Sequence, residues 1–192
     1  MGKEFELKYR ATPDKQEKIA GEFAPFSTIV METTYYDTKD RALSQRKMTL
    51  RRRLENGVSV CTVKTPEKGG VRGEWEVEAA EIEEAVPKLC KLGCPVDLEV
   101  LTKDGVSALC GARFTRRVAE ISLPGCGVEL ALDFGVLTGG GKEIPLCEVE
   151  LELKFGDAEA LLAFGEEFSA RYGLGKEPDS KFRRALALTV GE

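Results

Sequence analysis

Charged and apolar residues alternate one by one along several short stretches of the chain. In residues 4–9 one face of an extended strand would carry Glu4, Glu6 and Lys8, and the other face would be apolar. Similar patterns predict further strands over residues 28–37, 48–54, 58–64, 74–78, 113–123, 128–136 and 147–154. The chain is therefore expected to be rich in strands that have two chemically different faces.

Helical stretches are fewer and stand between these strands. Pro13 opens a predicted helix over residues 13–23, a second over 81–92 ends before Gly93, and two more cover 158–172 and 180–188. Residues 96–110 give no clear pattern. Asn56-Gly57 favours a tight turn that joins two of the strands as a hairpin. With 192 residues and no linker or repeat, we expect one domain over residues 1–192.

The charged faces allow two architectures. An open sheet would expose them to water, whereas a closed barrel would turn them inward and place the apolar faces under helices. Rows of glutamates on neighbouring strands favour the closed form, because like charges side by side destabilise a sheet that serves only for solubility. The predicted fold class is α+β, with a closed antiparallel barrel, a charged interior and flanking helices.

Composition narrows the function. The chain has 42% hydrophobic and 32% charged residues, which is typical of a soluble globular protein. No apolar stretch is long enough for a membrane span or a signal peptide, so we expect no membrane partner. The net charge of −5 disfavours a nucleic-acid partner. Because the chain has no histidine, catalysis by Ser-His-Asp or Cys-His groups and histidine-ligated zinc are excluded.

The six cysteines are scattered without a Cys-x-x-Cys pair. Cys90 and Cys94 lie four residues apart, but a zinc site would need a second pair of ligands. We therefore expect reduced cysteines and a cytoplasmic location. Carboxylates beside arginine and lysine are the groups that bind a polyanion carrying divalent cations, since the carboxylates hold the metal and the basic groups hold phosphate oxygens.

An ordered set of motifs along nearly the whole chain resembles the CYTH superfamily, the triphosphate tunnel metalloenzymes. The motifs, in chain order, are Glu4-x-Glu6-x-Lys8, Tyr36-Asp37-Thr38, Leu50-Arg51-Arg52-Arg53, Thr62-x-Lys64, Arg72-x-Glu74-x-Glu76, Glu129 to Gly135, Glu148-x-Glu150-x-Glu152 and Ser180-Lys181. The resemblance implies an eight-stranded antiparallel tunnel. It also implies, with Mg²⁺ or Mn²⁺, hydrolysis of inorganic, thiamine or nucleoside triphosphate, cyclisation of ATP, or removal of RNA 5′-triphosphate ends.

The resemblance assigns roles to individual residues. Catalytic groups are expected at Glu4, Glu6, Lys8 and Glu150, and the metal ligands are expected at Glu4, Glu6, Glu76, Asp133, Glu148, Glu150 and Glu152. Phosphate-binding groups are expected at Lys8, Arg51, Arg53, Lys64, Arg117 and Lys181. The stretch Arg113-Phe114-Thr115-Arg116-Arg117 departs from the family's Lys-x-Arg pair, and alternation places Arg117 on the face of Arg113 and Thr115.

The sequence thus predicts metal-dependent hydrolysis of a triphosphate, with inorganic triphosphate preferred because no motif addresses an organic head group. Cyclisation of ATP to cyclic AMP, and binding of polyphosphate or nucleotide without turnover, remain open alternatives. The exposed flank of a barrel would also allow a homodimer.

Overall fold

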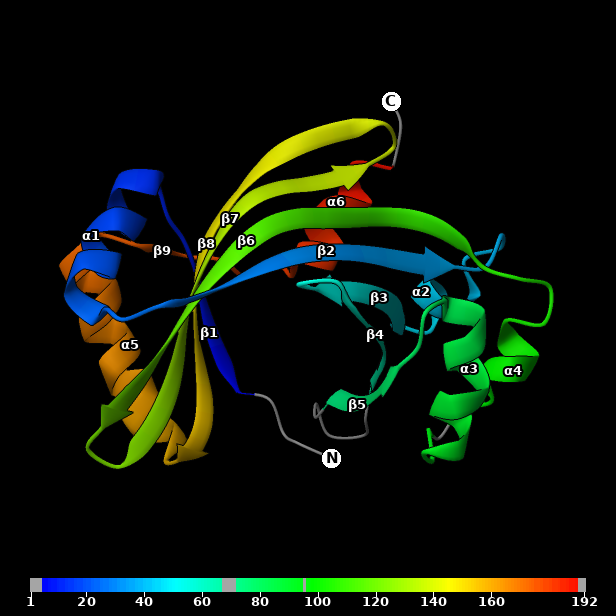
Figure 1. Cartoon of the computed structure of the whole chain (residues 1–192), viewed down its shortest axis with the longest axis horizontal. Helices are drawn as coiled ribbons and strands as arrows, with labels where there is room; N and C mark the ends of the chain where they lie inside the picture. Colours follow the sequence, from blue (N-terminus) through cyan, green and yellow to red (C-terminus); the bar gives the residue numbers. More distant parts are fainter. Residues whose placement is uncertain (1–4, 67–71, 95, 190–192) are drawn as a thin grey trace.

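The computed structural model describes residues 5–66, 72–94 and 96–189, in which nine strands and six helices are present (Figure 1). The strands are β1 Glu6–Arg10, β2 Ser27–Asp37, β3 Thr49–Glu55, β4 Val58–Pro66, β5 Arg72–Glu78, β6 Ser107–Leu123, β7 Cys126–Gly139, β8 Lys142–Gly156 and β9 Gly175–Lys176. The helices are α1 Pro13–Phe23, α2 Ala42–Gln45, α3 Ile82–Lys91, α4 Leu98–Leu101, α5 Ala158–Tyr172 and α6 Lys181–Ala187.

All strands belong to one antiparallel sheet in the order β5-β4-β3-β2-β6-β7-β8-β1-β9. The prediction of a closed eight-stranded barrel is wrong, because the sheet is open and ends at β5 and β9. The second edge of β1 is taken by the segment that follows α5: Tyr9 pairs with Lys176, and the Glu177 amide donates to the Lys8 carbonyl at 2.9 Å. In the part of the chain that is described, no ladder joins β5 to β1 or β9.

The long strands β2, β6, β7 and β8 bend into an arch, and α6 packs against its inner side (Figure 1). Ala185 of α6 contacts a buried cluster that includes Met31, Tyr35, Phe114 and Leu137. The inner side is therefore apolar at this end and charged elsewhere, so the predicted charged interior describes only part of it.

The outer faces are covered by helices, as the alternation predicts. Ile19 of α1 and Phe168 of α5 pack on the apolar side of β1, β7 and β8, with Leu130 and Leu151 among their neighbours. At the other end, α3 and α4 cover β3, β4 and β5, and Leu89 is fully buried there. Burial of these apolar faces is the main force that holds the helices on the sheet.

The predicted turns and helices agree with the structure where the sequence pattern is clear. Asn56 and Gly57 both have positive φ, 49° and 89°, so the predicted tight turn between β3 and β4 is confirmed. The predicted helix over 158–172 coincides with α5. The unclear stretch contains α4 and the start of β6, and the short elements α2 and β9 were not predicted. The described helices are all too short or too polar to cross a lipid bilayer.

Candidate active site

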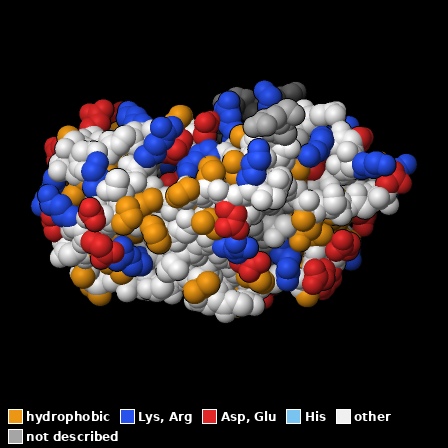
Figure 2. All heavy atoms as spheres, turned by 90° about the horizontal axis from the view of Figure 1, so that it is seen from above, with side chains coloured by type: hydrophobic (Ala, Val, Ile, Leu, Met, Phe, Trp, Pro, Cys, Tyr) orange, Lys and Arg blue, Asp and Glu red, His pale blue; other side chains and the backbone are white. Residues whose placement is uncertain are grey.

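A cavity of about 660 Å³ lies on the inner side of the sheet. Among the described residues, six basic and three acidic side chains line it: Lys8, Arg51, Arg53, Lys64, Arg116 and Lys181, with Glu6, Glu150 and Glu152. Basic and acidic side chains are interspersed on the surface seen from above (Figure 2), whereas basic side chains predominate in the cavity. The cavity is thus suited to a multiply charged anion.

Strand register explains why these side chains share one space. Directly opposed residues of antiparallel strands point to the same face of a sheet. Glu6 opposes Glu152, and Lys8 opposes Glu150. On the other side of the arch, Arg51 opposes Thr62, whose hydroxyl donates to Glu76 at 3.0 Å. The alternation in the sequence therefore converges on one cavity although the sheet does not close.

Three carboxylates gather at one end of this site. Asp133, Glu148 and Glu150 each offer an oxygen within 4.8 Å of the others, and all three residues are buried. We call them the carboxylate cluster. An all-oxygen donor set of this kind fits a hard divalent cation such as Mg²⁺ or Mn²⁺.

Basic side chains neutralise the carboxylate cluster. The Lys181 ammonium lies 2.8 Å from Asp133, 2.6 Å from Glu148 and 2.6 Å from Glu150. Arg116 donates two hydrogen bonds of 2.7 Å to Asp133 and a further one to Glu150. Arg184 pairs with Glu148. Three cations thus face three carboxylates, which makes their burial tolerable.

The proximity of these charges shifts the pKa values. Burial alone would raise the pKa of the Glu150 carboxyl, but the charges of Lys181, Arg116 and Lys8 lower that pKa to about 2. Burial alone would lower the pKa of Lys181, but Asp133 and the two glutamates raise it. Glu150 and Lys181 therefore both stay charged at neutral pH.

The opposite end of the cavity carries three basic side chains, and Arg53 among them pairs with Glu55. The Lys64 ammonium lies 3.0 Å from Glu74, and Arg51 lies 3.5 Å from the same carboxylate. Burial lowers the pKa of the Arg53 guanidinium, and the charges of Arg51 and Arg116 lower it further. The Nε atoms of Arg51 and Arg53 are buried without a hydrogen-bond partner among the described residues. An anion in the cavity would reduce the repulsion among these arginines and accept hydrogen bonds from the two Nε atoms.

Most of the predicted site residues lie together. Glu4 lies outside the described residues. The cavity is lined by Glu6, Lys8, Arg51, Arg53, Lys64, Glu150, Glu152 and Lys181, and Asp133 and Glu148 adjoin it in the carboxylate cluster. Glu76 is on β5 next to this lining and accepts the hydrogen bond from Thr62.

The placement of Arg117 was predicted wrongly. Arg117 points to the outer face, where it pairs with Glu17 of α1 at 2.9 Å, and Arg116 lines the cavity instead. The reason is register, because Arg116 opposes Asp133 on β7 and must share its face. The sequence pattern does not show that Arg116 pairs with Asp133, and this pairing decides which arginine faces the cavity. Arg184 was also missed, since a basic residue in a terminal helix gives no signal of its own.

Asp37 of the Tyr36-Asp37-Thr38 motif has a structural role. Its buried carboxylate accepts hydrogen bonds from the Leu43 amide at 3.0 Å and from the Ser44 amide at 3.1 Å. These bonds fix the start of α2 against the end of β2. Neither Asp37 nor Thr38 is among the described residues that line the cavity.

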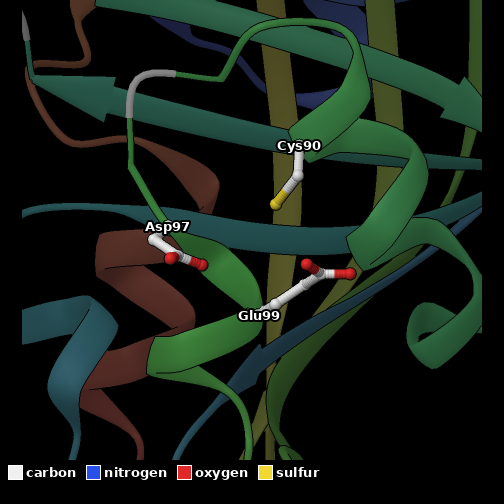
Figure 3. Close-up of side chains that lie close together, drawn as sticks. All are labelled: Cys90, Asp97 and Glu99. Atoms are coloured by element: carbon white, nitrogen blue, oxygen red, sulfur yellow. The ribbon is translucent and has the colours of Figure 1, made fainter.

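A second group of possible metal ligands lies on α3 and at the start of α4. The Cys90 thiol and the Asp97 and Glu99 carboxylates point toward one space (Figure 3). Asp97 also accepts a hydrogen bond from the Val100 amide at 3.0 Å and so caps α4. Both carboxylates are exposed, and helix capping accounts for Asp97 without a metal.

Comparison with known proteins agrees with this geometry. The CYTH domain model matches residues 2–186. An inorganic triphosphatase from Haemophilus influenzae is 28% identical over 195 residues, which cover 98% of this chain and 55% of that protein. The chain thus spans about half the length of this curated relative.

Solved structures share the fold. A Hippeastrum protein, described as a candidate adenylyl cyclase with a dominant triphosphatase activity, has a TM-score of 0.63 at 20% identity and covers 97% of each chain. The PH1819 protein from Pyrococcus horikoshii has a TM-score of 0.61 at 23% identity, covering 96% of this chain and 98% of its own. Because the family model matches almost the full length, the chain belongs to the CYTH domain family.

Proposed function

We propose that this protein is a divalent-metal-dependent hydrolase that converts inorganic triphosphate to pyrophosphate and phosphate. The observation that carries the proposal is the cavity, in which six basic side chains stand beside a buried carboxylate cluster. The similarity to an inorganic triphosphatase supports the same substrate class. The six free cysteines support a reducing cytoplasmic location.

The basic side chains would bind and orient the substrate. Arg51, Arg53 and Lys64 hold phosphate oxygens at one end, and Lys8 and Lys181 reach the phosphates next to the carboxylates. Water attacks the terminal phosphorus, the bridging P–O bond breaks and pyrophosphate leaves. The fixed positive charges stabilise the negative charge that develops on the leaving oxygen.

The carboxylates would hold the divalent cation. The ligands would be Glu6, Asp133, Glu148, Glu150 and Glu152, and the predicted ligands Glu4 and Glu76 would complete the proposed set. When bound, the cation supplies positive charge that neutralises phosphate oxygens and favours attack at phosphorus. The carboxylates themselves keep that charge in place next to Lys8 and Lys181.

One observation favours cyclisation of ATP, or hydrolysis of another organic triphosphate, as the second candidate. Part of the cavity wall is apolar, with Met31, Tyr35, Phe114 and Phe182 among its lining residues. The Tyr35 and Phe182 rings are 4.9 Å apart between centroids. Such a wall can contact a base or another organic head group, for which the sequence motifs give no signal.

Phosphate release at alkaline pH with Mg²⁺ or Mn²⁺ tests the proposal. Inorganic triphosphate, ATP and thiamine triphosphate are compared, and cyclic AMP is measured in the ATP reaction. Faster turnover of inorganic triphosphate than of the others supports the proposal, and cyclic AMP supports the second candidate. Tight binding of triphosphate without turnover of any substrate would instead make the protein a binding module.

A further inference from the structure

Gln16 is a buried polar residue on the helix that covers the carboxylate-bearing strands from outside. It lies on α1, one turn before the core residue Ile19, and is only 2% exposed. Its side-chain amide nitrogen donates hydrogen bonds to two backbone carbonyls, that of Asp133 at 2.9 Å and that of Glu148 at 2.8 Å. One side chain thus bridges neighbouring strands.

The two bridged residues belong to the carboxylate cluster. Asp133 and Glu148 are directly opposed on β7 and β8, so their side chains project together to the inner face. Gln16 approaches the same two residues from the outer face. It therefore ties the two backbones together at the position that carries these two carboxylates.

The spacing of carboxylate oxygens determines how well they bind a divalent cation. Ligand oxygens must approach the ion to about 2.0–2.6 Å. Even a slight movement of β7 away from β8 therefore weakens cation binding at a site that both strands share. We propose that Gln16 is a positioning residue that fixes the spacing of the Asp133 and Glu148 carboxylates and so sets the cation affinity of the carboxylate cluster. This inference rests on the proposed function in taking the cluster as a cation site.

Direct binding of Mn²⁺ to the full chain without substrate, followed by electron paramagnetic resonance, tests the inference. Gln16→Met removes both donors while keeping nearly the same side-chain length. We expect Mn²⁺ to bind this variant about tenfold more weakly than the wild type, because no side chain then ties the Asp133 and Glu148 carbonyls together. If Gln16→Met does not fold, Gln16→Asn takes its place, since the shorter amide cannot bridge both carbonyls.

Ile19→Ala is the matched control. It removes a fully buried side chain from the same helix and core, and it leaves the hydrogen bonds of Gln16 in place. We expect it to lower the thermal stability at least as much as Gln16→Met, with Mn²⁺ affinity within twofold of the wild type. Equal losses of affinity in both variants would show that Gln16 only stabilises the fold, and would overturn the inference.

The result is separable from the proposed function. Weaker Mn²⁺ binding by Gln16→Met supports the inference even if the wild type hydrolyses no triphosphate. Unchanged Mn²⁺ binding by Gln16→Met overturns it even if the wild type is an active triphosphatase. Absence of Mn²⁺ binding by the wild type would overturn the inference directly.

Discussion

Replacing Lys181 by methionine would remove the cation that touches all three members of the carboxylate cluster. The ammonium lies within 2.8 Å of each carboxylate, and its side chain is only 12% exposed. Removing one partner of a buried ion pair costs about 3–5 kcal/mol, because the remaining charge is left without compensation. Since Arg116 and Arg184 stay in place, we expect a loss near the lower end, about 3 kcal/mol.

Urea unfolding followed by circular dichroism, at neutral pH in a chelating buffer, measures this loss. Lys154→Met is the matched control, because Lys154 lies 3.3 Å from Glu129 and 3.2 Å from Glu152 but is 44% exposed. An exposed pair of this kind contributes only about 0–1 kcal/mol. If Lys181→Met were no less stable than Lys154→Met, the buried ion pairs of Lys181 would not stabilise the fold more than an exposed pair does.

Added Mn²⁺ gives the same variant a second test. Without the ammonium, no lysine competes with a divalent cation for the oxygens of the three carboxylates. We therefore expect Mn²⁺ to raise the urea midpoint of Lys181→Met by more than that of the wild type, since a ligand that binds only the folded state stabilises it. An equal shift in both proteins would show that the ammonium and the metal do not share these oxygens.

Three further predictions concern charge and titration. Arg53→Met is expected to lower kcat/KM for triphosphate about tenfold to a hundredfold through loss of a charge-assisted hydrogen bond, whereas Arg117→Met on the outer face should stay within twofold. The lowered pKa of Glu150 means that its stabilisation is complete above pH 4.5, the ordinary value, and is lost as the pH falls toward about 2. Urea unfolding across that range should therefore show a steeper decline for the wild type than for Glu150→Gln. Burial raises the pKa of the Cys61 thiol to about 11 and that of Cys110 to about 12, so Ellman's reagent at pH 8 should modify both only after unfolding, and rapid labelling of either thiol in the native protein would contradict this.

Alternation identified the inner face wherever one face is charged and the other is apolar. On β8 the glutamates at 148, 150 and 152 lie on one face, and Val149 and Leu151 lie on the other. The structure buries Val149 and Leu151 in the core, as expected. The stretch Arg113–Arg117 has charge on both faces, so its pattern favours neither orientation. Only the pairing of Arg116 with Asp133 settles the orientation, and pairing is a property of the whole sheet.

The alternation of charged and apolar residues also does not show that the sheet is open. The element that occupies the free edge of β1 is β9, which has only two residues and no alternation of its own. Its position depends on Glu177, whose buried carboxylate pairs with Arg10 at 2.8 Å. The sequence shows which faces are charged, but the closure of a sheet depends on such single contacts between distant segments.

The distribution of charge inside the site explains why the cavity should select a polyanion that carries a cation. The carboxylate cluster is already balanced by Lys181, Arg116 and Arg184, so it attracts no additional anion. Arg51 and Arg53 pair with Glu74 and Glu55, but their buried Nε atoms have no hydrogen-bond partner among the described residues and can still donate to a phosphate oxygen. A phosphate chain that binds there and extends toward Lys181 would compete with the carboxylate cluster for the Lys181 ammonium. The carboxylate oxygens that lose the ammonium could then bind a divalent cation. Binding of the polyanion and of the cation should then strengthen each other, because each removes the charge that opposes the other.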